Sequence, residues 1–372
     1  MEKPRFYELC DEMGFLVWQV FPLHYTYSDS DDVIERTSPM MAEMVRMLYN
    51  RPSIVIWSVF KEPKVYALEP KPNNYGRLCQ IMYEEGSTVD PIRWVHTGDY
   101  EEGVQNIMPG LTQPGETDVR SVPLKPQIVE FGSGAIPPIE TVKEILKPEE
   151  MWPPVWDRWM YLNVNPMWFK RQGIDVDSKS SIEELIEENQ TWSARQIKES
   201  AEFLRQRKYR PVSSMFLYFW NDPWPCLFGS GLLDYYRRKY KSYDIYRMVY
   251  SPVLVSIEWV KEKHYVGFEK IYGPGESLVA NIWVTNDLYE EYGGASLAWC
   301  IKDPDGKVIE EKKSLIDIPR DSSRIVENLF WSIPLEADGS YRVEAQVKDG
   351  SGKMLSENYF DFTVQGSRGF QK

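Results

Sequence analysis

The sequence predicts an α/β barrel-like part over residues 1–250, followed by an all-β sandwich over residues 251–372. Two apolar segments predict the first part, because each has the pattern of a buried parallel strand with a glutamate at its end. A change of periodicity near Pro252 predicts the second part, since alternating strands and turn sequences replace helices there. At 372 residues the chain is long enough to hold two such domains.

The segment from Arg51 to Glu62 contains the first of these strands. Its middle, Ile54 to Phe60, is an uncharged run rich in branched residues, and it ends in Lys61 and Glu62. In α/β barrels the carboxyl ends of the strands form the active-site face, so Glu62 is a candidate catalyst. A glutamate that only caps a loop is the simpler alternative at a single position of this kind.

The segment from Pro126 to Gly132 repeats the arrangement, with Glu130 at the end of a short apolar strand. Two strand-end carboxylates are what glycoside hydrolysis requires, because one protonates the leaving oxygen and the other attacks the anomeric carbon. In the retaining geometry the two carboxyl groups lie about 5 to 5.5 Å apart. The pair Glu62 and Glu130 therefore predicts a glycosidase site at one end of the strands.

The remaining elements follow from periodicity and from turn residues. Helices are expected over 6–13, 38–49, 73–85 and 196–207, with a helix start at the capping sequence Ser180-Ser181-Ile182-Glu183. Further strands of the barrel part are expected over 15–19, 94–97, 104–108 and 213–220. Sandwich strands are expected over 253–259, 278–284, 296–301, 325–333 and 341–347. Because Cys300 beside Trp299 has no cysteine partner nearby in sequence, we expect an immunoglobulin-like sandwich with an apolar core and no intersheet disulfide.

Composition excludes several classes of function. A formal charge of −13 disfavours nucleic-acid binding, which depends on clustered Lys and Arg. The four cysteines and three histidines are dispersed, so we expect no metal site. No apolar run approaches the roughly 20 residues that span a bilayer, and the N-terminus lacks an apolar signal core. We therefore expect a cytoplasmic chain without membrane contact.

Beyond these patterns, the chain resembles glycoside hydrolase family two, most closely its β-mannosidase and exo-glucosaminidase branch. The resemblance implies that Glu62 is the general acid/base and Glu130 the nucleophile, that no cofactor is needed, and that the partner is a carbohydrate substrate. It implies further substrate-binding residues, with Trp220 as a platform under the sugar, joined by Trp18, Lys61, Asp222 and Trp224. The segments that carry it are Phe6 to Gln19, Arg51 to Ser58, Glu130-Phe131-Gly132 with Ile136 to Thr141, and Leu217 to Pro225.

The same resemblance implies that the barrel is incomplete and contains about strands 3 to 8. Strands missing from a barrel leave unpaired edges, so we expect the chain to associate with itself or with a polypeptide that supplies them. The chain also departs from the family pattern at Lys61, where an asparagine precedes the acid/base. It departs again at Val20, Asn106 and Met108, where the family has an acidic residue, a histidine and a tyrosine.

Three interpretations remain open at the level of sequence. The first is a retaining β-glycosidase of the β-mannosidase type that acts on terminal β-linked sugars. The second is a sugar-binding or interaction protein that kept the fold after losing catalysis, which Lys61 favours. The third is one half of a split glycosidase.

Overall fold

The computed structural model describes residues 1–24, 28, 30–61, 76–98, 103–111, 119–259 and 270–366. The chain divides into two compact units, residues 1–106 and 107–372, and the division falls within strand β4 (Val104–Ile107). No helix in this described part is both long enough and apolar enough to span a bilayer.

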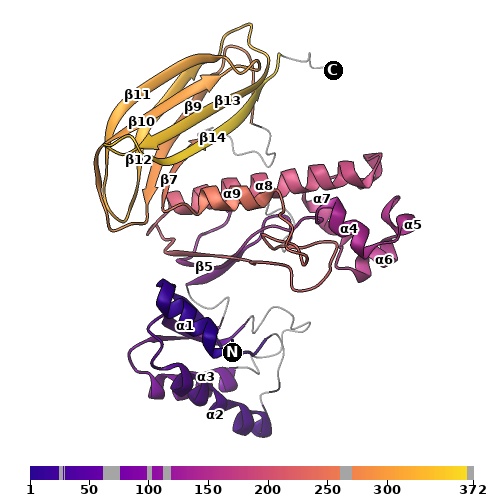
Figure 1. Cartoon of the computed structure of the whole chain (residues 1–372), viewed down its shortest axis with the longest axis vertical. Coiled ribbons are helices and arrows are strands. Elements are labelled where there is room, and N and C mark those ends of the chain that lie inside the picture. Colours follow the sequence, from indigo (N-terminus) through magenta and orange to yellow (C-terminus); the bar gives the residue numbers. More distant parts are fainter. Residues whose placement is uncertain are drawn as a thin grey trace. The chain divides into compact units, whose positions relative to one another are not determined.

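The first unit contains a three-stranded parallel sheet accompanied by helices (Figure 1). The strands lie in the order β1-β2-β3, so their carboxyl ends share one edge of the sheet. Apolar side chains of the sheet and the helices form its core, in which Met41 and Trp57 are fully buried. The elements are α1 (Pro4–Met13), β1 (Val17–Val20), α2 (Asp31–Leu48), β2 (Ile54–Phe60), α3 (Gly76–Val89) and β3 (Trp94–Gly98).

Local sequence explains how this unit is built. Helix α1 ends where Gly14 adopts a φ of 73°, from which its N–H donates to the carbonyl of Cys10. Under strand β2, the indole of Trp57 donates to the Asp90 carboxylate at 2.9 Å, and the Arg93 guanidinium donates to the same oxygen at 2.7 Å. The buried Trp57 is therefore a core residue with its one polar atom satisfied.

The second unit begins with a sheet in the order β4-β5-β6, in which β5 and β6 are parallel. Its apolar core includes Ile128 and Phe131 from β5 and Leu204 from the long helix α8. The elements are β4, η1 (Val119–Ser121), β5 (Gln127–Phe131), α4 (Ile139–Ile145), α5 (Pro148–Met151), α6 (Trp156–Tyr161), α7 (Pro166–Arg171), η2 (Val176–Ser178), α8 (Ile182–Gln206), β6 (Ser214–Leu217) and α9 (Ser242–Val249).

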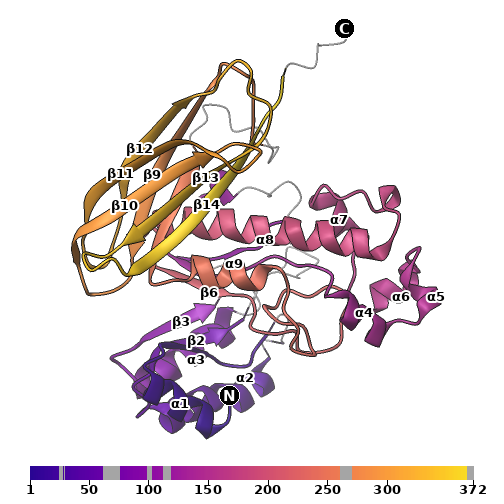
Figure 2. The same ribbon diagram turned by 45° about the horizontal axis from the view of Figure 1, so that its top comes forward.

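Helix α8 is one continuous helix of 25 residues, whereas the sequence suggested a separate helical stretch from Gln196. Its N-cap is Ser181, whose hydroxyl accepts from the N–H of Glu184 at 3.2 Å. The Glu184 carboxylate in turn accepts from the N–H of Ser180, so the cap lies one residue later than the capping sequence suggested. In both views α8 runs beside the sandwich (Figure 1, Figure 2).

The rest of the second unit is a two-sheet β-sandwich (Figure 2). One sheet has the order β11-β10-β13-β14-β8 and the other the order β12-β9-β7. The inward side chains form an apolar core, and none of the four cysteines forms a disulfide bond. The strands are β7 (Val253–Trp259), β8 (Ile271–Tyr272), β9 (Ser277–Asn286), β10 (Tyr292–Lys302), β11 (Val308–Ile318), β12 (Ser322–Ser332), β13 (Gly339–Lys348) and β14 (Met354–Val364).

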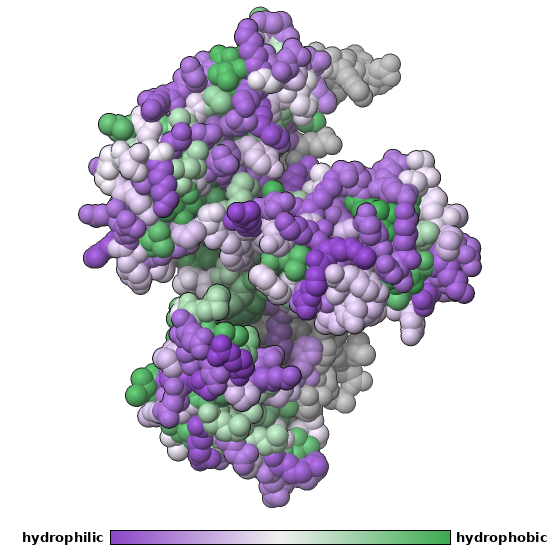
Figure 3. Space-filling model, in the orientation of Figure 1, coloured by the Kyte–Doolittle hydropathy of each residue, from purple (hydrophilic) through white to green (hydrophobic). Residues whose placement is uncertain are grey.

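Three of these strands, β8, β11 and β14, were not expected from sequence. Strand β11 is an edge strand whose first six residues are all exposed, so it has little of the alternation that marks a half-buried strand. Strand β14 alternates buried and exposed residues, but the polar Ser356 and Asn358 occupy buried positions and interrupt its apolar pattern. The visible face of the sandwich is mainly hydrophilic, with hydrophobic residues as separate spots (Figure 3).

The structure confirms the predicted fold class. The strands β1 to β6 form two three-stranded sheets that do not close into a barrel, and an immunoglobulin-like sandwich follows them. The domain boundary expected at residue 250 falls between α9 and β7. As a division into domains it stays a prediction, since the compact units separate near residue 106.

Candidate functional site

Glu130 lies next to the C-terminal end of β5, where the sequence placed the nucleophile. Its side chain is 7% exposed. The adjacent strand β6 is parallel to β5, and the N–H of Tyr218 donates to the carbonyl of Phe131 at 2.9 Å. Glu62 lies outside the described residues, so its pairing with Glu130 stays a prediction.

Gly132 has a steric reason to follow this strand. A Cβ atom at Gly132 would lie 2.5 Å from the carbonyl oxygen of Tyr218, which is much closer than an ordinary contact. Because the obstacle is backbone, a flexible side chain cannot move aside to make room. The glycine of the Glu130-Phe131-Gly132 motif therefore allows β5 and the end of β6 to approach each other closely.

Two tryptophans of the loop after β6 are exposed. Trp220 is 65% exposed and Trp224 is 40% exposed. The carbonyl of Trp220 accepts from the N–H of Leu232 at 3.2 Å and from that of Leu233 at 3.3 Å. The backbone of Trp220 is therefore held by the returning segment of its loop. Its ring is exposed and available to a ligand, as a sugar platform requires.

Asp222 is buried, although the sequence placed it among the substrate-binding residues. It is 1% exposed, and its carboxylate accepts from the Tyr240 hydroxyl at 2.6 Å and from the N–H of Gly231 at 3.0 Å. Burial raises the pKa of Asp222, against the effect of these hydrogen bonds. Both oxygens are thus engaged within the protein, and a contact with substrate stays a prediction.

Lys61 and Trp18 belong to the first unit. The N–H of Lys61 donates to the carbonyl of Leu23 at 2.8 Å, so the pairing of the two chain segments continues past β1 and β2. This places Lys61 directly after the C-terminal end of β2. The ring of Trp18 lies 5.8 Å from that of Trp94 and 5.6 Å from that of His96. Trp18 therefore belongs to an aromatic cluster on the parallel sheet.

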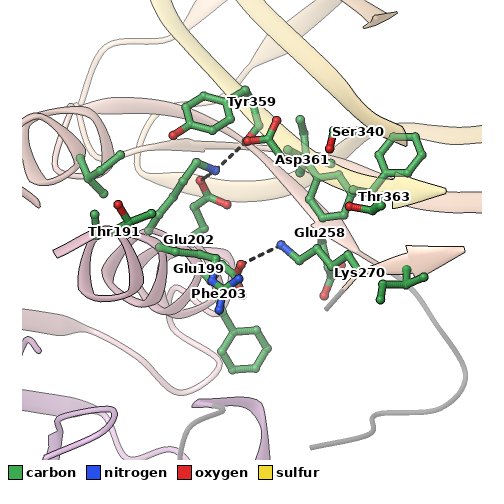
Figure 4. Close-up of a pocket in the computed structure, with 18 of the residues that line it drawn as sticks. Thr191, Glu199, Glu202, Phe203, Glu258, Lys270, Ser340, Tyr359, Asp361 and Thr363 are labelled. Carbon is green, nitrogen blue, oxygen red and sulfur yellow. Dashed lines mark hydrogen bonds and ion pairs between the residues drawn. The ribbon is translucent and has the colours of Figure 1, made fainter. Parts of the chain in front are cut away.

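A cavity of about 440 Å³ lies within the second unit, between α8 and strands β7, β8 and β14 (Figure 4). The Lys198 ammonium donates to Glu202 at 2.5 Å and to the carbonyl of Tyr359 at 2.7 Å. The Lys270 ammonium donates to Glu199 at 2.8 Å. Burial opposes ionisation of Glu199, but Lys270 outweighs it and lowers the pKa of the carboxyl. These charges pair with one another, so this wall of the cavity acts as a polar joint between α8 and the sandwich.

Among the described residues, no group of three or more His, Cys, Asp or Glu side chains is placed to hold a metal ion. Sequence reasoning missed Tyr240 and Gly229, which contact Asp222. A local motif could not reveal them, because Tyr240 and Asp222 meet only through the folding of the loop.

Two family models match the chain. Residues 2–113 match the TIM barrel domain of glycosyl hydrolases family 2, and residues 279–364 match the mannosidase Ig/CBM-like domain. Over these two segments the chain is similar to the family 2 glycosyl hydrolases. The resemblance recognised from the sequence is thereby confirmed for both parts of the chain.

Sequence relatives match over short segments. A β-mannosidase of Capra hircus is 38% identical over 58 residues, which are 15% of this chain and 7% of that protein. A putative β-glucuronidase of Formosa agariphila is 34% identical over 61 residues, which are 16% of this chain and 7% of that protein.

Solved structures match over nearly the whole chain. The β-D-mannosidase of Dictyoglomus thermophilum has a TM-score of 0.76 at 20% identity, covering 97% of this chain and 44% of that one. The exo-chitosanase CsxA of Amycolatopsis orientalis has a TM-score of 0.71 at 13% identity, covering 98% and 44%. At these identities the likeness shows the fold, and the chain spans less than half of either structure.

Proposed function

We propose that this chain carries the catalytic region of a retaining β-glycosidase of the β-mannosidase type, which acts on terminal β-linked sugars. The observation that carries the proposal is the position of Glu130, buried at the C-terminal end of a parallel strand. The relation to family 2 supports it, because the matched barrel segment includes Glu62.

In the proposed reaction Glu130 attacks the anomeric carbon while Glu62 protonates the leaving glycosidic oxygen. The bond to the leaving group breaks as the Glu130 carboxylate forms a covalent glycosyl ester. Glu62, now ionised, then removes a proton from water, which attacks the same carbon and releases Glu130 as a carboxylate. The exposed ring of Trp220 offers an apolar surface for the sugar face, and no cofactor enters either step.

Covalent trapping tests the proposal. A 2-fluoro β-mannoside with an activated leaving group should label Glu130, because such a substrate needs little help from the acid. Mass spectrometry of the digested protein should place the adduct on the peptide that contains Glu130, and Glu130→Gln should abolish it. Labelling of a different carboxylate, or no labelling at sugar concentrations that saturate binding, would contradict the proposal.

A sugar-binding protein without catalysis is the second candidate, and Lys61 favours it. An ammonium beside Glu62 would favour the ionised carboxylate, which cannot donate a proton, and each unit of pKa is worth about 1.4 kcal/mol. This candidate predicts binding of a β-mannoside without turnover. With the missing barrel strands supplied, Lys61→Asn should then raise turnover of aryl β-mannosides, whereas Lys3→Asn, a change at an exposed N-terminal lysine, should leave it unchanged.

A further inference from the structure

The loop that carries Trp220 is closed by a buried carboxylate. The N–H of Asp222 donates to the carbonyl of Leu233 at 2.9 Å, and the side chain of Asp222 accepts from the N–H of Gly231 at 3.0 Å. The outgoing and returning segments of the loop are thus joined two residues after Trp220. The Tyr240 hydroxyl donates to the second oxygen of Asp222 at 2.6 Å and extends the connection to the end of the loop.

Two glycines are required by the close packing around this carboxylate. A Cβ at Gly229 would lie 2.0 Å from the Oδ2 atom of Asp222 and 2.4 Å from the Tyr240 hydroxyl oxygen. A Cβ at Gly231 would lie 2.8 Å from the backbone nitrogen of Asp222. The backbone at both glycines therefore lies closer to this cluster than a residue with a Cβ atom would allow.

This cluster is also connected to the segment that follows Glu130. The N–H of Ala135 donates to the carbonyl of Gly229 at 2.8 Å, and the N–H of Gly229 donates to the carbonyl of Ala135 at 2.9 Å. Because Gly229 packs on Asp222, the position of the Trp220 loop depends on the chain that leaves strand β5.

We propose that Asp222 and Tyr240 are positioning residues, which fix the exposed ring of Trp220 relative to the strand that carries Glu130. The proposal rests on the proposed function, in which the sugar lies against Trp220. Asp222 acts through the backbone of its loop, since both of its oxygens are engaged within the protein. Burial raises the pKa of the Tyr240 hydroxyl well above its usual value, so the tyrosine keeps its proton and donates it to Asp222.

The chain offers a matched pair of buried tyrosines for the test. Tyr240 and Tyr246 are each 3% exposed. Among the described residues the hydroxyl of Tyr246 has no hydrogen-bond partner, whereas that of Tyr240 donates to Asp222. Tyr240→Phe therefore removes one hydrogen bond and one oxygen atom, and Tyr246→Phe removes only the oxygen.

The first measurement is independent of sugar. The protein is labelled with 5-fluorotryptophan, and the ¹⁹F resonance of Trp220 is assigned by its loss in Trp220→Phe. In Tyr240→Phe this resonance should shift or broaden, while in Tyr246→Phe it should keep its position and width. An unchanged resonance in folded Tyr240→Phe would overturn the proposal. If Tyr240→Phe does not fold, Asp222→Asn provides the same test, because asparagine keeps an oxygen for the N–H of Gly231.

The second measurement is sugar affinity, by titration with a β-mannoside under conditions without turnover. Tyr240→Phe should weaken binding about two- to tenfold, the factor that one hydrogen bond is worth, and Tyr246→Phe should not. Equal affinities in the two variants would overturn the positioning role. If Trp220→Ala binds the sugar as tightly as the parent, the proposed platform fails, while the fluorine spectra still decide whether Asp222 and Tyr240 hold the ring.

Discussion

Replacing Gly132 by alanine would place an atom where the backbone of the neighbouring strand passes. The new Cβ would lie 2.5 Å from the carbonyl oxygen of Tyr218 and 3.3 Å from the Tyr246 hydroxyl oxygen. An ordinary contact of this kind begins near 3.4 Å, so the two segments must separate by almost 1 Å. Overpacking of this size costs about 1 to 3 kcal/mol, and here the obstacle is a peptide group.

The displacement should also affect the site. Gly132 is two residues from Glu130, and Tyr218 is two residues from Trp220. A shift of about 1 Å in catalytic geometry lowers rates by about a hundredfold. We therefore expect Gly132→Ala to slow the labelling of Glu130 by the 2-fluoro sugar. The rate should fall by a larger factor than the loss in the free energy of unfolding alone would explain.

Urea unfolding, followed by tryptophan fluorescence, measures the effect on stability. Gly293→Ala is the matched control, because a Cβ there meets Asp317 at an ordinary 3.9 Å and the φ of Gly293 is not positive. The control should unfold within about 0.5 kcal/mol of the parent. A Gly132→Ala protein as stable and as readily labelled as the Gly293→Ala control would refute the argument that close approach requires this glycine.

Three further predictions concern the buried charges and the platform. Asp90→Asn should lower the free energy of unfolding by about 2 to 4 kcal/mol at neutral pH, since Asp90 is 1% exposed and binds both Trp57 and Arg93. Burial opposes ionisation of Asp90, but these hydrogen bonds lower its pKa below the usual 3.8. Its contribution to stability is therefore complete well above that usual value, as at pH 7, and is lost as pH falls through the lowered pKa. Urea unfolding should show a smaller difference in stability between the parent and Asp90→Asn at pH 3 than at pH 7. Lys270→Met should destabilise by about 3 kcal/mol in the same assay, because it removes the ammonium that pairs with the Glu199 carboxylate, which is only 14% exposed. The double variant with Glu199→Leu should recover most of that loss, and a double variant no better than the single one would contradict this. Trp220→Ala should change stability by less than about 1 kcal/mol, since the ring is 65% exposed, but should weaken sugar binding measured by calorimetry; unchanged binding would remove the platform role.

The sequence predicted those features that depend on local pattern. The uncharged run from Ile54 to Phe60 is strand β2, and the alternation from Val253 to Trp259 is strand β7. Strand β11 could not be predicted in the same way, because an edge strand with exposed residues lacks the alternation that burial produces. Helix α8 is longer than its sequence pattern predicts, because its buried face contains polar residues such as Gln190 and Gln196, which interrupt an apolar stripe.

The candidate site residues show a second limit of prediction from sequence, because a motif does not reveal whether each of its side chains is exposed or buried. Trp220 and Asp222 lie two positions apart in one motif, and by sequence both were assigned to the sugar site. The structure exposes the ring of Trp220 and encloses the carboxylate of Asp222 between Gly231 and Tyr240. Residue type and spacing indicated that the motif was important, but only the folded loop determines which side chain can reach a ligand. Burying a carboxylate costs free energy unless its oxygens accept hydrogen bonds. Because Asp222 is enclosed in this way, we infer that the motif maintains the shape of the loop.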